Sequence, residues 1–188
     1  DDVQHLSDIS SSGNPIKSLS GLDKCTALSQ LNIDRGELGD LGPLRALTNM
    51  LSITLSNNRI KDISPLSGMP QLQYLDLSGN QIADLAPLAG LTSLTSLYLA
   101  NNKVTDLSPL KNAGHLWSLY LAGNQVTDLW PIGGLKWLAT LDLKGNKIKD
   151  LSPLAGITSL TSLYLEGNPV SDLATLVDRK STRLNSSH

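Results

Sequence analysis

The stretch AGLTSLTSLYLANNKVTDLSPL, residues 89–110, recurs with drift from one end of the chain to the other. In steps of 22 residues, the sequence from Asp1 to Leu176 divides into eight units without insertion or deletion. A fixed period of this length indicates a stacked-repeat architecture, because one unit alone is too short to bury a core. The units begin at Asp1, Asp23, Arg45, Ser67, Ala89, Lys111, Gly133 and Ala155.

The units share a set of apolar positions that is neither helical nor alternating over its whole length. Only Leu97-Tyr98-Leu99 alternates, which predicts a brief strand with one buried face. The other apolar residues must point inward from a chain that turns round them, so we expect one coil per unit. In the central unit these positions are Leu91, Leu94, Leu97, Leu99, Val104, Leu107 and Leu110.

An asparagine follows the strand in every unit except the second, where Gly36 stands instead. A buried turn exposes backbone donors and acceptors, and an amide side chain can satisfy both kinds across neighbouring coils. We therefore interpret this column as structural. Its members are Asn14, Asn58, Asn80, Asn102, Asn124, Asn146 and Asn168.

An acidic column comes four positions after the asparagines, and a proline follows most of its members three residues later. Asp or Ser ahead of Pro is typical of a helix start, since the side-chain oxygen accepts a free N–H and Pro fits the first turn. We predict a short helical turn capped by Asp. Calcium is the weaker interpretation, because one Asp per coil lacks the dense oxygen cage that calcium needs.

The pattern LxxLxxLxLxxNxIxDLxPL resembles the 22-residue class of leucine-rich repeats, most closely the internalin-like repeats of bacterial surface proteins. The resemblance covers residues 1–176. It implies an α/β fold, namely a right-handed solenoid with a parallel β-sheet on its concave face and short 3-10 turns or loops on its convex face, and it implies a binding role. The helical cap and the immunoglobulin-like segment usual in internalins are not visible in this sequence.

Composition excludes several classes of function. The 15 basic and 17 acidic residues nearly balance, so no electrostatic reason exists to expect nucleic acid. No apolar run is long enough to span a membrane, and we expect no membrane insertion. The single cysteine, Cys25, falls in an apolar column and is expected to be buried. No signal peptide precedes Asp1, so an export signal of a secreted protein would lie outside this sequence.

The two ends depart from the repeat. The first unit is degraded, with Ser11 at an apolar position, as expected for a terminal repeat. The second surrounds Gly36 with Asp34, Arg35 and Glu37, which predicts a different local turn. Residues 177–188 lack the apolar pattern, so we predict a disordered tail after the 1–176 repeat domain, of which a non-native origin is one interpretation. Leucines exposed at an uncapped end would permit end-to-end self-association.

The outward strand positions carry the predicted binding site, since all four tyrosines of the protein fall there. Parallel strands lie about 4.8 Å apart, so the row from Asp76 to Tyr164 would span roughly 19 Å. Tyr is enriched among binding hot spots, whereas the plain alternative is that it stabilises the sheet. The predicted ligand-binding residues are Tyr74, Asp76, Tyr98, Tyr120, Asp142, Lys144, Tyr164 and Glu166.

A second cluster lies at the flank of this row. Trp117 and Trp137 come just before the strands of units six and seven, beside His115. They would widen the binding patch, but partly covered packing residues would give the same pattern.

Catalysis finds no support in the sequence. The three histidines are not placed to serve a nucleophile, and there is no phosphate loop, nucleotide fingerprint or Cys/His metal spacing. We expect no enzyme activity, no catalytic residues, no cofactor and no metal.

We therefore expect a recognition module that binds a protein or glycan through its concave face, in a secreted or cell-surface protein. The alternatives are a scaffold segment of a larger, cytoplasmic protein and a designed consensus repeat without a natural ligand.

Overall fold

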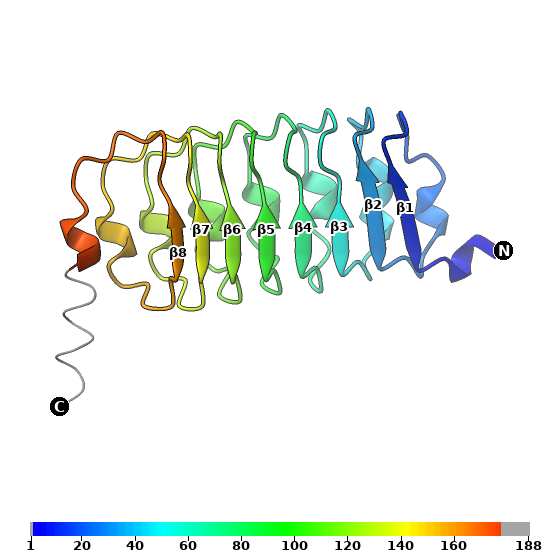
Figure 1. Ribbon diagram of the computed structural model, residues 1–188. Coiled ribbons are helices and arrows are strands. Elements are labelled where there is room, and N and C mark those ends of the chain that lie inside the picture. Colours follow the sequence, from blue (N-terminus) through cyan, green and yellow to red (C-terminus); the bar gives the residue numbers. More distant parts are fainter. Residues whose placement is uncertain (1, 178–188) are drawn as a thin grey trace.

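The computed structural model describes residues 2–177, in which eight strands form one parallel sheet in sequence order (Figure 1). Each strand is followed by a turn that crosses to the opposite side of the molecule and returns, so the chain winds as a solenoid. The strands are β1 (Asp8–Ser12), β2 (Gln30–Asp34), β3 (Ser52–Thr54), β4 (Tyr74–Asp76), β5 (Ser96–Tyr98), β6 (Ser118–Tyr120), β7 (Thr140–Asp142) and β8 (Ser162–Tyr164).

The strand register equals the repeat period. Leu97 pairs with Leu119, and Tyr98 pairs with Tyr120, each 22 residues further along. The strands begin one residue before the predicted segment, but the backbone N–H of Leu99 still donates to the Tyr120 carbonyl at 2.8 Å. One coil per unit is therefore confirmed, and each sequence column becomes a row across the sheet. We call the outer face of the sheet the concave face.

Short 3-10 helices occupy the side opposite the sheet, behind the strands in Figure 1, except the first, which lies at the N-terminal end. From the third onward each holds a proline as its second residue, a place that tolerates the missing N–H. The 3-10 helices are η1 (Asp2–His5), η2 (Leu22–Lys24), η3 (Gly42–Ala46), η4 (Ser64–Leu66), η5 (Ala86–Leu88), η6 (Ser108–Leu110), η7 (Trp130–Ile132) and η8 (Ser152–Leu154). Residues 174–177 form a further helical turn.

The acidic column caps these turns, as predicted. The Oδ1 atom of Asp62 accepts the backbone N–H of Ser64 at 2.8 Å, and the contact repeats in each unit from the second to the eighth. The N-cap residue itself is the apolar one in between, such as Ile63. The capping carboxylate therefore belongs to the residue before the N-cap, whereas in a standard cap it belongs to the N-cap residue itself. The column consists of Asp40, Asp62, Asp84, Asp106, Asp128, Asp150 and Asp172.

The asparagine column forms a hydrogen-bonded ladder along the solenoid. The Oδ1 atom of Asn102 accepts the N–H of Ile82 in the preceding coil at 2.9 Å, and its Nδ2 donates to the carbonyls of Leu77 and Leu99 at 3.0 and 3.1 Å. Each buried amide thus satisfies backbone groups of two coils. The same pattern recurs at Asn58, Asn80, Asn124, Asn146 and Asn168.

Asn14 does not belong to this ladder, so the expectation that it bridges neighbouring coils is wrong. Its side chain is exposed and donates to Ser11 Oγ at 2.8 Å, and residues 2–177 contain no earlier coil that it could bridge to. Gly36 interrupts the ladder for a steric reason. A Cβ atom at Gly36 would lie 2.7 Å from Asn58 Oδ1, an oxygen that already accepts the N–H of Leu38.

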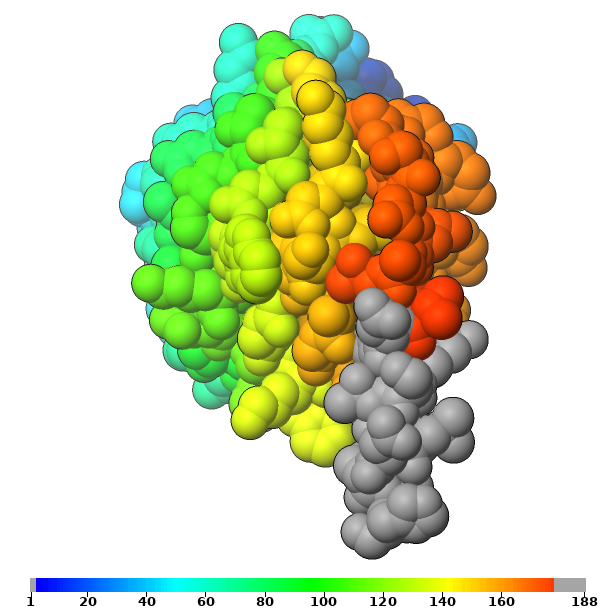
Figure 2. All heavy atoms as spheres, turned by 90° about the vertical axis from the view of Figure 1, so that its left-hand side faces the viewer, coloured from blue at the N-terminus to red at the C-terminus, as the bar shows by residue number. Residues whose placement is uncertain are grey.

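The interior is built from stacked rows of leucine and isoleucine, most of them fully buried. Burying one such side chain contributes roughly 1.5–3 kcal/mol. Cys25 is buried in this core, as expected. Figure 2 looks onto the C-terminal end, where the last coil, in orange and red, lies on the yellow coil of the seventh repeat. Leu173 and Val177 are exposed there, and the predicted tail from residue 178 onward lies outside the described residues.

Candidate functional site

The concave face carries the predicted row of side chains in register across four strand pairings. Asp76 on β4 pairs with Tyr98, Tyr98 with Tyr120, Tyr120 with Asp142, and Asp142 with Tyr164 on β8. Since the flanking strand residues on either side of each position point into the core, these five side chains all project to the same surface.

Three tyrosines of this surface form a ring stack, which we call the tyrosine ladder: Tyr74, Tyr98 and Tyr120. The Tyr98 and Tyr120 rings are parallel, with an interplanar angle of 3° and centroids 4.5 Å apart. The Tyr74 ring leans on Tyr98 at 43°, with centroids 5.3 Å apart. Neighbouring rings hold one another in place, so the ladder is a rigid, partly exposed aromatic surface.

The hydroxyl groups of Tyr74 and Tyr98 stay protonated at neutral pH. Burial is the main cause that raises the pKa of Tyr74 and of Tyr98 above 10.0, and the negative charge of Asp76 adds to it. A hydrogen bond joins the hydroxyl groups of these two tyrosines within the ladder.

The C-terminal part of the row contains a lysine. Lys144 Nζ lies 5.3 Å from the centroid of the Tyr164 ring and 3.8 Å from Asp142 Oδ2. Asp142 Oδ1 also accepts the backbone N–H of Lys144 at 3.1 Å, which fixes the carboxylate. Glu166 is exposed in the last described coil. The structure therefore brings together Asp142, Lys144 and Tyr164 in mutual contact, beside the ladder.

The proposed flank consists of exposed side chains. Trp117 and Trp137 are 56% and 61% exposed, and they precede β6 and β7. His115 is exposed too, and its Nδ1 lies 2.9 Å from the Thr92 carbonyl oxygen. Among residues 2–177, the ring contacts join tyrosines alone, so the tryptophans lie beside the ladder without stacking on it.

The N-terminal half of the same face contains a polar hollow that sequence reasoning missed. It has a volume of about 200 Å³ and is lined by Asp8, Ser10, Gln30, Leu31, Asn32, Ser52 and Thr54. Asn32 Oδ1 is buried and, within the described part of the chain, has no hydrogen-bond partner. The only signal in the sequence was the run of small polar residues in these columns, which is equally typical of a solvated strand face.

The irregular second unit forms contacts within the chain. Asp34 accepts hydrogen bonds from Ser56, Asn57 and Ser12 at 2.8, 3.1 and 3.3 Å. Although burial opposes its ionisation, these bonds and the Arg35 charge together hold the pKa of Asp34 below its usual value. The Glu37 carboxylate lies near Lys17 and Arg59, so it forms ion pairs with both of them.

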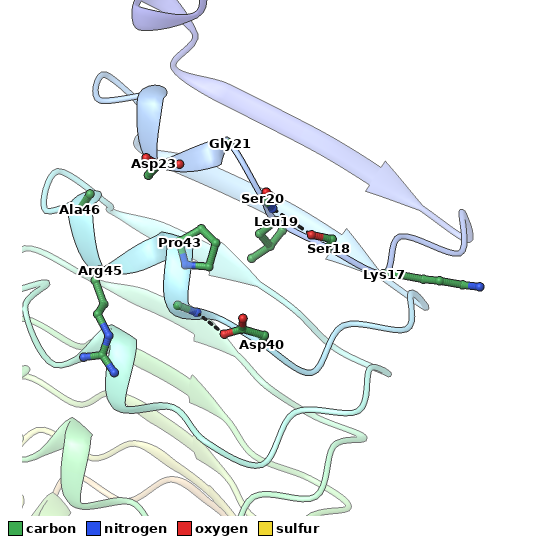
Figure 3. Close-up of a pocket in the computed structure, with 11 residues that line it drawn as sticks. Lys17, Ser18, Leu19, Ser20, Gly21, Asp23, Asp40, Pro43, Arg45 and Ala46 are labelled. Carbon is green, nitrogen blue, oxygen red and sulfur yellow. Dashed lines mark hydrogen bonds between the residues drawn. The ribbon is translucent and has the colours of Figure 1, made fainter.

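A larger hollow of about 470 Å³ lies on the side of the 3-10 turns, between the first coils (Figure 3). It forms where Gly21, with a φ of 87°, replaces the proline of later turns. Two of its polar groups already have partners: Asp40 accepts the N–H of Gly42, and Arg45 donates to Ser64 Oγ. In Figure 3 Lys17 extends away from the hollow. This opening therefore lacks convergent polar groups.

Residues 2–177 contain neither a metal-binding cluster nor a helix suited to span a membrane. No group of three or more His, Cys, Asp or Glu side chains in this range is placed to hold a metal ion. No helix in the same range has the length and apolarity to cross a membrane.

Comparisons with known proteins agree with this architecture. The family model for leucine-rich repeats (two copies) matches residues 48–89, 70–112, 115–156 and 136–178. A search of curated proteins found no match. Internalin C2 of Listeria monocytogenes is 35% identical, with a TM-score of 0.92, over 95% of this chain and 79% of its own.

Two further solved structures are similar over most of this chain. An internalin of Listeria monocytogenes, inlF, is 27% identical, with a TM-score of 0.66, over 94% of this chain and 65% of its own. The plant peptide hormone receptor RGFR1 shares the fold alone, at 22% identity and a TM-score of 0.81, over 95% of this chain and 31% of the receptor. The repeats, their register and these similarities agree: the chain belongs to the leucine-rich-repeat family and is internalin-like.

Proposed function

We propose that this chain is a non-catalytic recognition module that binds a protein through its concave face. The observation that carries the proposal is the tyrosine ladder on the outer face of the sheet. The centroid of the Tyr98 ring lies 4.5 Å from that of Tyr120 and 5.3 Å from that of Tyr74. Stacked rings lose little conformational entropy on binding, because neighbours already restrict them.

The fold itself supports an interaction role. A solenoid presents an extended surface on which residues from many repeats meet one partner. The plant receptor that shares this fold was solved in complex with RGF2, which is consistent with a protein ligand on such a scaffold. A glycan is the other ligand class that tyrosine and aspartate would suit, since carboxylates accept hydrogen bonds from sugar hydroxyls.

The proposed binding residues extend from the ladder to its C-terminal neighbours. Asp142, Lys144 and Tyr164 continue the surface, with Asp76 and Glu166 at its two ends. His115, Trp117 and Trp137 would enlarge it at one edge, and their exposure favours contact with a partner over a packing role.

The test is a capture experiment with host-cell and bacterial surface extracts. The parent protein is compared with a variant that carries Tyr98→Ser, Tyr120→Ser and Tyr164→Ser. Trp130→Ser serves as the matched control, because Trp130 is also an exposed aromatic residue but starts η7 on the opposite side. Circular dichroism melting checks that all variants fold.

We expect a partner that the parent and Trp130→Ser retain and that the folded triple variant loses. If the triple variant retains the partner, the concave tyrosines are not the site, and Trp117→Ser with Trp137→Ser is tested next. Capture by an immobilised glycan array in place of a protein would overturn the protein as ligand. Failure of every capture would favour the scaffold or designed-repeat alternatives.

We further propose a secreted or cell-surface location, on the strength of the likeness to internalins. A signal peptide or wall anchor encoded next to this sequence would support it, and an adjoining intracellular domain such as a GTPase would favour the cytoplasmic alternative.

Self-association is a separate proposal. Leu173 and Val177 are exposed at the C-terminal coil, so a solution mass that rises with concentration and falls back in a Leu173→Asp variant would support contact between copies. A constant monomer mass would argue against it.

A further inference from the structure

The row of concave side chains that includes the tyrosine ladder has a gap between two rings. Along this row Tyr98 and Tyr120 come from β5 and β6, Asp142 from β7 and Tyr164 from β8. The Tyr98 and Tyr120 centroids lie 4.5 Å apart, close to the spacing of about 4.8 Å between strands, so flat groups on adjacent strands of this row stack. Tyr120 and Tyr164 are two strands apart, which separates them by roughly 9–10 Å. One flat group fits between them.

The face of Tyr120 that borders this gap is uncovered. Tyr98 covers the face of Tyr120 on the β5 side, and among residues 2–177 no ring stacks on the opposite face and no cation lies over it. The neighbouring outward positions carry Thr140 and Ala122, whose side chains are too short to fill the space between two rings. The gap is therefore open on the side of Tyr120.

On the side of Tyr164, the gap holds a lysine that is easily displaced. Lys144 Nζ lies 3.8 Å from Asp142 Oδ2 and 5.3 Å from the Tyr164 centroid, so one face of Tyr164 is turned toward the carboxylate. The backbone N–H of Lys144 donates to Asp142 Oδ1 at 3.1 Å and keeps the carboxylate in place. The side chain of Asp142 is 14% exposed, whereas that of Lys144 is 48% exposed. Exposed ion pairs and exposed cation–π contacts are weak, so another cation can take the place of this lysine.

We propose that the gap between Tyr120 and Tyr164 is a slot for an arginine side chain of the protein partner, with Asp142 at its base. A guanidinium is flat, so it would stack on both rings, and its N–H groups would donate to the carboxylate. Lys144 occupies part of the slot in the free protein and would turn toward solvent when the arginine enters. A lysine of the partner would gain less, because its ammonium group is a compact charge without a flat face. The proposal rests on the proposed concave-face function and names the chemistry which that face recognises.

The test follows backbone amide signals of the ¹⁵N-labelled protein by NMR while N-acetyl-arginine amide is added. N-acetyl-citrulline amide is the flat, uncharged control, and N-acetyl-lysine amide is the charged control that is not flat. We expect a saturable shift of the Tyr120 and Lys144 amide signals with the arginine compound, and binding at least about tenfold weaker with either control. Equal binding of a control compound, or no response to the arginine compound, would overturn the proposal.

Three variants test the parts of the slot. Lys144→Ser introduces the residue that the same repeat position carries at Ser56 and Ser78, and it should strengthen arginine binding about three- to tenfold because no lysine has to be displaced. Adding Asp142→Asn to this variant should abolish the binding. Tyr74→Leu is the matched control, because it alters the ladder at the end away from the slot and should leave the binding unchanged. Circular dichroism melting identifies the folded variants. Unchanged or weaker binding in folded Lys144→Ser, or a loss in Tyr74→Leu, would contradict the proposal.

This experiment needs no natural partner, so its result is separate from that of the capture experiment. Arginine binding in the slot without any captured protein would support the slot and leave the proposed function unsupported. Capture of a protein that depends on the concave tyrosines, with no response to the arginine compound, would support the proposed function and overturn the slot.

Discussion

The rings of Tyr98 and Tyr120 lie parallel at 4.5 Å, although their strands are separated by a full repeat of the chain. Tyr98 also contacts Tyr74, so it is the central ring of the ladder. Each ring contact contributes about 0.5–1.5 kcal/mol beyond area burial. The ladder therefore stabilises the sheet as well as presenting a surface.

From this arrangement we expect Tyr98→Ser to lower the free energy of unfolding by about 1–3 kcal/mol, because it removes two ring contacts. Tyr164→Ser loses only the contact with Lys144 and should cost about 1 kcal/mol or less, as for an exposed cation–π pair. Urea unfolding of both variants measures the difference. Equal losses would show that the stack adds nothing to stability.

The asparagine ladder predicts that Asn→Ala substitutions in one column lower the stability by very different amounts. Asn102→Ala leaves the N–H of Ile82 without its partner, whereas the carbonyls of Leu77 and Leu99 each lose one of two asparagine donors and keep Asn80 and Asn124. One buried unsatisfied group costs about 1–3 kcal/mol, so we expect a loss of about 1–3 kcal/mol. Asn14→Ala is the matched control from the same column and should change stability by less than about 0.5 kcal/mol, since Asn14 is exposed. Thermal and urea melts compare the two, and similar losses would refute a structural ladder.

At Gly36 we expect a substitution by alanine to lower the stability, although Gly→Ala commonly raises it at sites with this backbone conformation. Its backbone φ is not in the left-handed region, and Gly→Ala at such a site commonly stabilises by about 0.4–1 kcal/mol. Here the new Cβ would lie 2.7 Å from Asn58 Oδ1 and 3.0 Å from the Ile16 carbonyl oxygen. We expect Gly36→Ala to destabilise by about 1–3 kcal/mol, as overpacking does. A variant more stable than the parent in urea would show that Asn58 can move aside.

The capping carboxylates predict weaker stability in acid. Hydrogen bonds from the Ser108 and Ser152 side chains and backbones lower the pKa of Asp106 and of Asp150 from 3.8. The unfolded chain then binds these protons more tightly, so the contribution is complete above pH 3.8 and is lost as the pH falls through the lower folded values. Urea midpoints measured between pH 7 and pH 2.5 should decline chiefly below pH 4.

The control for this prediction is the double variant Asp106→Asn and Asp150→Asn, in which these two groups cannot titrate. Its urea midpoint should fall less steeply between pH 4 and pH 2.5 than that of the parent. Parallel curves for the two proteins would show that the caps do not account for the acid dependence.

Much of the architecture follows from the period of the sequence. With one coil per 22 residues, positions that share a column must stack, so the row from Asp76 to Tyr164 could be written down in advance. The Asp caps and the buried role of Asn102 followed in the same way, because the backbone groups of each turn need partners. The exception at Asn14 shows that the inference depends on a preceding coil.

The sequence by itself thus determined the fold, the register and the face on which each tyrosine lies. Only the tertiary structure decided which neighbours touch: that Tyr98 stacks flat on Tyr120, that Lys144 lies over Tyr164, and that Asn32 borders a hollow with an unpartnered oxygen. The physical reason is that a repeat period sets where each Cα lies. Side-chain rotamers, and the close contacts and hollows they make or leave, depend on the particular residues in adjacent coils.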